Sequence, residues 1–178
     1  MSSIKNVDKL NAKIDNLQNI ITDKDFKNSI NRANKLYVQA EAKLLCPVNQ
    51  GELRNSIKST VEINTDKITA VTYTDKDYAS YVEFGTGPVG QANHEGISPN
   101  FTPSYSSHGW GIPADQVDMN DAIKYKWPKR TYNGKDYYMT SGQPAQPFMY
   151  PALKNNEKKV KEEIQKTLVK KIMKEVKK

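Results

Sequence analysis

The sequence predicts an α+β fold: a small antiparallel sheet packed with N-terminal helices and a long C-terminal helix, plus a long inserted loop with a second hairpin. Apolar residues recur at helical spacing near both ends, whereas β-branched residues and tyrosines alternate with polar residues between them. We expect a single domain over residues 1–178, with a helical arm (1–46), a core (47–87 and 144–178) and an insert (88–143).

The first 46 residues carry two apolar stripes at helical spacing. Thr22, followed by Asp25, resembles an N-cap with an acidic first turn, which indicates a break between two helices. Pro47 ends the second helix, because proline has no N–H and restricts the residue before it. Cys46 continues the apolar pattern, so a buried side chain is favoured over a reactive thiol. The stripes are Leu10, Ile14, Leu17 and Ile21, then Phe26, Ile30, Ala33, Tyr37, Ala40 and Leu44.

A short helix and a β-hairpin are predicted next. Asn49–Glu52 looks like a capping box that starts a helix with Leu53 and Ile57 on one face. Alternation at Val61 and Ile63, then a run rich in Ile, Val, Thr and Tyr at 67–74, predicts two strands joined by the turn residues 64–66. Beyond them, Tyr78, Tyr81 and Val82 have helical spacing, and the helix ends at Gly85-Thr86-Gly87.

The insert begins as an aperiodic segment. Residues 88–119 are rich in Gly, Pro, Asn and Ser, which predicts a loop. Ile123, Tyr125 and Trp127 then alternate with lysines as in a strand, and Pro128 confines that strand to a sheet edge or interrupts it. Asn133-Gly134, before Tyr137, is the signal for a tight hairpin.

The chain is predicted to be helical from Pro147 or Pro151 to its end. Phe148, Tyr150 and Leu153 are expected to anchor this helix to the sheet. Its narrow apolar stripe consists of Leu153, Val160, Ile164, Leu168, Ile172 and Val176.

The net charge of +7 resides mainly in the last 25 residues, which hold ten Lys and four Glu. No apolar run approaches the length of a membrane span, and the start lacks the apolar stretch of a secretion signal, so we expect no membrane partner and synthesis in a cytoplasm. His94 and His108 lack ligand-type spacing, and no nucleophile has a matching base. We therefore expect no metal, no cofactor and no catalysis.

Three segments resemble the gene-ten-like family of phage head-tail joining and tail-component proteins. They are PVNQGELRNSI (47–57), YASYVEFGTG (78–87) and QPFMYPAL (146–153), in that order. The family more often has Asp-Thr where this chain has Asn49-Gln50, and the insert is longer than in compact relatives. The motif residues are Pro47, Gly51, Leu53, Arg54, Tyr78, Tyr81, Glu83, Phe84, Gly85, Gly87, Pro147, Phe148, Pro151 and Leu153.

The resemblance implies a structural role at the head-tail junction, in neck formation, tail completion or tail termination. Subunits would form a ring, of six copies by that resemblance, at the head-proximal end of a phage tail or of a headless tail-like particle. Partners would be other copies of the chain and neighbouring neck, connector and tail-tube proteins, with transient contact to DNA in the ring lumen. The particle would be assembled in the cytoplasm of a bacterial host.

Glu83 lies among apolar residues, where an ionised carboxylate needs a partner. Arg54 is the candidate, within one subunit or between two, and the alternative is that both side chains are simply exposed.

A different class of function stays open: a basic nucleic-acid-binding module that uses the Lys-rich C-terminal helix. Interleaved glutamates favour packing of that helix on a neighbouring subunit instead. The basic and aromatic residues of 124–130 are compatible with single-strand binding, although an edge strand guarded by lysines explains them as well. The candidate interface residues are Tyr125, Trp127, Tyr137, Ile164, Leu168 and Ile172.

Overall fold

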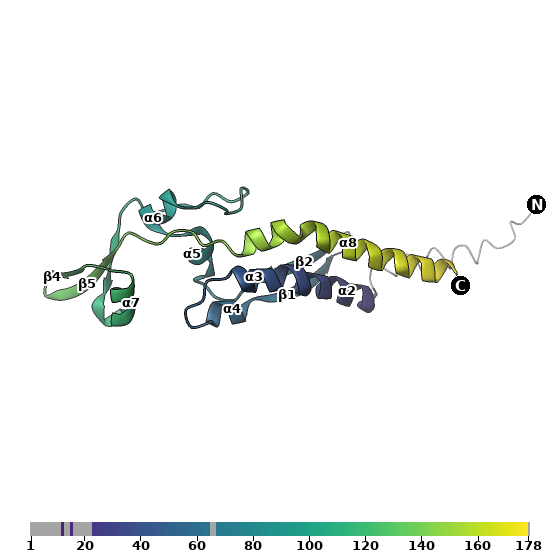
Figure 1. The fold of residues 1–178 in the computed structure, drawn as a ribbon, viewed down its shortest axis with the longest axis horizontal. Coiled ribbons are helices and arrows are strands. Elements are labelled where there is room, and N and C mark those ends of the chain that lie inside the picture. The colour runs from purple at the N-terminus through teal and green to yellow at the C-terminus, as the bar shows by residue number, and fades with distance from the viewer. Residues whose placement is uncertain (1–11, 13–14, 16–22, 65–66, 178) are drawn as a thin grey trace, which may run out of the picture. The chain divides into compact units, whose positions relative to one another are not determined.

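The computed structural model describes residues 12, 15, 23–64 and 67–177. The chain has the predicted α+β fold, with helices, small antiparallel sheets and a long C-terminal helix (Figure 1). It divides into two compact units, here called unit 1 (residues 1–75 and 151–178) and unit 2 (residues 76–150). Whether the chain is a single domain stays a prediction.

Unit 1 packs helices against a hairpin. A continuous helical run consists of α2 (Lys24–Asn34), the π-helical turn η1 (Lys35–Gln39) and α3 (Ala40–Leu45). After α4 (Glu52–Ser56), strands β1 (Lys58–Asn64) and β2 (Lys67–Tyr73) pair in antiparallel register, with Val61 opposite Ala70. The remainder is most of α8 (Met149–Val176). Its core cluster is Phe26, Ile30 and Val61, packed by Ile68, Ala70, Ile164 and Leu168.

The start of α2 lies one residue beyond the predicted cap. Asp23, not Thr22, is the N-cap, and its carboxylate accepts the N–H of Asp25 at 3.0 Å. The helix predicted for Leu10–Ile21 lies outside the described residues, apart from Ala12 and Asp15, which are helical and exposed.

The π-helical turn η1 corrects the second predicted stripe. A π turn accommodates an extra residue, so the side chains after it are rotated relative to a continuous α-helix. Phe26, Ile30 and Ala33 are buried as predicted. Val38 within η1 is buried, as are Ala42 and Cys46 beyond it, whereas Leu44 is 78% exposed.

The predicted capping box at Asn49 is also wrong. Gly51, with φ of 83°, is the N-cap of α4, and no side chain caps that helix. Both expected inward residues of this segment, Leu53 and Ile57, are nevertheless buried.

Unit 2 contains short elements around a three-stranded antiparallel sheet. They are α5 (Ala79–Phe84), α6 (Gly87–Ala92), β3 (Trp110–Pro113), the 3-10 turn η2 (Ala114–Gln116), α7 (Met119–Lys124), β4 (Lys129–Tyr132) and β5 (Lys135–Thr140). The strand order is β3-β5-β4. Residues 93–109 have no helix or strand, as the predicted loop requires, but the rest of 88–119 supplies α6, β3 and η2.

The second hairpin is confirmed and the strand before it is not. Asn133 and Gly134 both have positive φ, 49° and 73°, as a type I′ turn requires. The edge strand β4 begins directly after Pro128. The predicted strand at Ile123–Trp127 is instead the end of helix α7 and the turn after it. Asp118 caps α7 by accepting the N–H of Asn120 at 2.7 Å, a local signal that favours the helix.

Candidate functional site

Unit 2 brings together two of the three motif segments, YASYVEFGTG and QPFMYPAL. The main chain of Gln146 donates to the Val82 carbonyl at 2.8 Å, and the Gln143 side chain donates to the Tyr81 carbonyl at 2.9 Å. Thr86 and Gln143 form an isolated antiparallel bridge. Gln143 was expected only to end the insert, so this contact was missed by sequence reasoning.

Glu83 is the polar centre of this arrangement, and it is only 6% exposed. One carboxylate oxygen accepts the N–H groups of Phe148 and Met149 at 2.7 and 2.9 Å, and the other accepts that of Tyr150 at 3.0 Å. These amides lie at the start of α8, where N–H groups have no intrahelical acceptor and negative charge is favoured. Pro151 follows and has no N–H to satisfy.

The buried charge of Glu83 is therefore satisfied within the chain without Arg54, and an Arg54–Glu83 pair between subunits stays a prediction. Three main-chain N–H groups satisfy the carboxylate, and Arg54 is exposed. A signal for this contact was present in the sequence. The residue before α8 is Phe148, which cannot cap a helix, so the helix start needed an acceptor from elsewhere in the chain.

Gly85 allows the two segments to approach at main-chain distance. Its φ is 75° and its ψ is 176°, a region of backbone conformation that is essentially restricted to glycine. A Cβ atom at this position would lie 2.7 Å from the Ala145 nitrogen and 2.9 Å from the Gln143 oxygen. The glycine is thus required both by its conformation and by close packing. Gly87, predicted to end the preceding helix, begins α6.

The other motif residues divide into buried and exposed positions. Phe148 is fully buried, whereas Leu153, its expected partner in anchoring α8, is 52% exposed. Tyr78 and Tyr81 are exposed, and Phe84 stacks on Phe101 with ring centroids 4.4 Å apart. Pro47 directly follows α3 and its cap residue, and Pro147 directly precedes Phe148.

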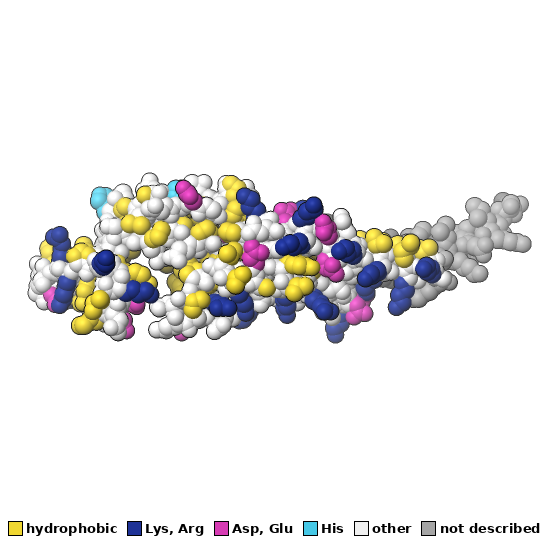
Figure 2. All heavy atoms as spheres, in the orientation of Figure 1, with side chains coloured by type: hydrophobic (Ala, Val, Ile, Leu, Met, Phe, Trp, Pro, Cys, Tyr) yellow, Lys and Arg dark blue, Asp and Glu magenta, His cyan; other side chains and the backbone are white. Residues whose placement is uncertain are grey.

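The candidate interface residues also divide. Ile164 and Leu168 pack on the core cluster of unit 1, so the structure uses them within the subunit. Ile172, Trp127 and Tyr137 are half-buried, and Tyr125 is exposed. Instead, exposed apolar side chains of unit 1 occur at other helical positions and at Val48 after α3: Leu36, Leu44, Leu45, Val48, Leu153, Val169, Met173 and Val176. Figure 2 shows hydrophobic side chains at the surface near the C-terminal end of α8.

Two polar contacts fix α8 beside the N-terminal helical run within unit 1. Lys171 pairs with Asp23, and the amides of Asn155 and Asn156 donate to the Glu41 carboxylate. The hydrogen bonds from Asn155 and Asn156 hold the pKa of Glu41 below its usual range. These contacts make the two helices antiparallel, with Leu44 and Leu153 at the same end of the pair.

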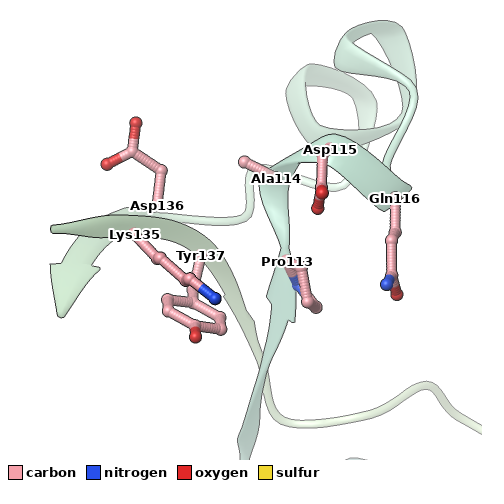
Figure 3. A pocket seen from close by; sticks show the side chains of 7 residues that line it. All are labelled: Pro113, Ala114, Asp115, Gln116, Lys135, Asp136 and Tyr137. Atoms are coloured by element: carbon pink, nitrogen blue, oxygen red, sulfur yellow. The ribbon is translucent and has the colours of Figure 1, made fainter. Parts of the chain in front are cut away.

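A polar groove of about 500 Å³ lies in unit 2 beside η2 and the start of β5. Figure 3 shows Lys135 and Tyr137 on one side of β5 and the Asp136 carboxylate pointing to the other. Asp136 pairs with Lys129 at 2.7 Å and accepts from the Thr131 hydroxyl at 2.7 Å. These partners lower the pKa of Asp136. A second acidic residue, Asp115 on η2, also lines the groove.

In the part of the chain that the structure describes, no helix combines the length and hydrophobicity needed to cross a bilayer. No curated protein and no solved structure matches the chain. Residues 8–85 match the model of a family described as bacteriophage HK97-gp10-like tail components. The match includes the first motif segment and the second as far as Gly85, which contains Glu83. Residues 8–85 of this chain are therefore similar to the HK97-gp10-like family of phage tail components, as the motif segments predicted.

Proposed function

We propose that this chain is a non-enzymatic subunit of a ring at the head-proximal end of a phage tail or tail-like particle. The family match carries the assignment to a phage structural component. Ring formation, a copy number of six, and contacts with neck, connector and tail-tube proteins are proposed from the family resemblance. Assembly in the bacterial cytoplasm belongs to the same proposal.

The surface of unit 1 supports an assembling subunit. Leu36 and Leu44 lie eight residues apart on the helical run and are 61% and 78% exposed. Single exposed apolar residues are common in monomers. Here several lie at one end of the pair formed by α8 and the N-terminal helical run, where Leu45 and Leu153 are exposed together with Leu44. A heterologous contact through such a surface closes into a ring when its rotation permits.

The Lys-rich helix α8 is less suited to binding nucleic acid than its number of lysines indicates. Lys161 pairs with Glu157, Lys171 pairs with Asp23, and Lys159 donates to the Asn156 side chain at 3.2 Å. Each of these contacts holds a lysine within the subunit. We therefore place the main role of α8 in packing, with any contact to lumen DNA secondary.

A double variant, Leu36→Asp with Leu44→Asp, tests the proposal. Both side chains are exposed, so we expect retained folding by circular dichroism and a mass in solution reduced from an oligomer to 20.2 kDa. Lys35→Asp is the control, because Lys35 is exposed and adjacent to Leu36 but carries no apolar surface of that kind. An oligomer that survives the double variant unchanged would remove this surface from the ring contact.

A further inference from the structure

Two aromatic rings stack at the end of α7 in unit 2. The ring centroids of Tyr125 and Trp127 are 5.4 Å apart, with an interplanar angle of 28°. The Nζ atom of Lys124 lies 5.0 Å from the centroid of the Tyr125 ring. Tyr125 is 51% exposed and Trp127 is half-buried. The pair therefore offers aromatic surface to solvent with a cation beside it.

The main chain holds this pair in place. The N–H of Trp127 donates to the Ala122 carbonyl at 3.0 Å, and that of Lys126 donates to the Ile123 carbonyl at 3.1 Å. These two bonds form a Schellman motif, in which Lys126 occupies the left-handed position that glycine usually takes. Its φ is 55°. A lysine at such a position is conformationally unfavourable, and such exceptions cluster at functional sites.

A groove of about 510 Å³ lies next to the stacked rings. Its walls are Tyr125, Trp127, Pro128 and Met139, together with Gly109, the last residue of β5 (Thr140) and the two residues after it. All of these residues belong to unit 2. The groove therefore combines apolar and aromatic side chains with the polar residues Thr140 and Ser141.

The segment that carries the stacked rings is basic. Lys124, Lys126, Lys129 and Arg130 lie within seven residues that contain no acidic side chain. Asp136 neutralises Lys129. Lys126 and Arg130 are exposed and have no ion-pair partner in the described part of unit 2. Three cations, Lys124, Lys126 and Arg130, thus remain available to a polyanion.

We infer that this surface binds single-stranded nucleic acid, with a base stacked on Tyr125 or Trp127 and phosphates at Lys124, Lys126 and Arg130. Exposed aromatic rings combined with cations are the arrangement by which proteins hold unpaired bases. The explanation as a lysine-guarded edge strand applies to Lys129 and Arg130, which lie on the edge strand β4, but not to residues 124–127, which are the end of α7 and the turn after it. The site lies within unit 2 and does not depend on ring formation.

The test uses the full chain and a fluorescent oligothymidylate of about 12 nucleotides, within the site sizes of small single-strand-binding folds. We expect affinity to fall with added salt, with a slope of about −2 in log K against log salt for three phosphate contacts. Trp127→Ala should weaken binding about 5- to 150-fold, the range for one lost base stack, while Trp127→Phe retains most of it. A blunt duplex of the same sequence should bind more weakly.

Lys126→Gly provides a variant that cannot be explained by misfolding. Glycine favours the left-handed conformation at this position, so stability should be equal or higher while one cation is lost. We expect weaker binding and a salt slope reduced by about 0.7. Lys166→Ala with Lys170→Ala on α8 is the control, because both lysines are exposed in unit 1, and it should leave affinity unchanged.

Several results would overturn the inference. They are equal affinity for the blunt duplex, full competition by polyglutamate, an unchanged affinity in both Trp127→Ala and Lys126→Gly, or a loss of binding in the α8 control. The last result would assign binding to the Lys-rich helix, and competition by polyglutamate would show a site for any polyanion.

Discussion

Units 1 and 2 are stabilised by different means. In unit 1, Phe26, Ile30 and Val61 form a cluster packed by apolar side chains from β2 and α8. In unit 2 the buried hydrophobic residues are few, and main-chain approach at Gly85 and the Glu83 carboxylate connect segments about 60 residues apart. Side-chain burial follows a periodic sequence pattern, whereas main-chain packing does not. We therefore expect unit 1 to be destabilised by loss of buried apolar side chains, and unit 2 by changes at Gly85 and Glu83.

The largest effect is expected in the core of unit 1. Phe26→Ala should lower the free energy of unfolding by about 3–5 kcal/mol, because it removes a buried aromatic side chain and leaves a cavity. Urea denaturation measures the loss, and hydrogen exchange should show it in unit 1. The exposed Leu36→Ala should change stability by less than about 0.5 kcal/mol. A small effect of Phe26→Ala would contradict the role given to this cluster.

In unit 2 the substitution to compare with Phe26→Ala is at Gly85, where two main-chain segments approach closely. Gly85→Ala should destabilise by at least about 1–3 kcal/mol from backbone conformation alone, with a further cost from the close approach to Ala145. Gly134→Ala is the matched control, since Gly134 also has positive φ but a Cβ atom there would have no heavy atom within 4 Å. Equal losses in the two variants would show that crowding at Gly85 contributes nothing.

Glu83→Gln tests the polar centre of unit 2. It should cost about 1–3 kcal/mol, because an amide offers one acceptor oxygen and directs its N–H₂ group toward main-chain donors. Glu83→Ala should cost more, since all three amides lose their acceptor. Hydrogen exchange measures the loss directly, because the amides of residues 148–150 should exchange faster in Glu83→Ala. Protection that persists at these amides in Glu83→Ala would refute the assignment.

The smallest effect concerns acid stability. Because the folded-state pKa of Glu41 is lowered, its contribution is present above the unfolded pKa and is lost as pH falls through the folded value. Glu41→Gln should remove this part of the acid dependence and cost about 0.5–1.5 kcal/mol near neutral pH. Denaturation midpoints from pH 7 to about pH 3 check it. Parallel pH curves for Glu41→Gln and the unsubstituted chain would contradict it.

The sequence predicted most of unit 1 because its signals are local and periodic. The β1–β2 hairpin, the end of the second helix near Pro47 and the long helix α8 follow from alternation, proline placement and apolar spacing. The position of Leu44 did not, because the π-helical turn η1 changes the helical phase and a fixed 3.6-residue period cannot express it.

Unit 2 was predicted only where a turn signal was strong. Asn133-Gly134 indicated the second hairpin, but alternation at Ile123–Trp127 indicated a strand although Asp118 offered a helix cap. The partner of Glu83 is a set of main-chain amides 65 to 67 residues away, which no residue type identifies. The pairing with Arg54 was predicted from charge alone, and within the chain these amides take the place of the guanidinium.

The mass of the purified chain in solution, measured by light scattering after size exclusion at low and high salt, tests the ring most directly. We predict a salt-stable multiple of 20.2 kDa near six copies, because apolar and shape contacts persist when charges are screened. A 20.2 kDa monomer at both salt concentrations, at every protein concentration tested, would contradict self-assembly of the ring.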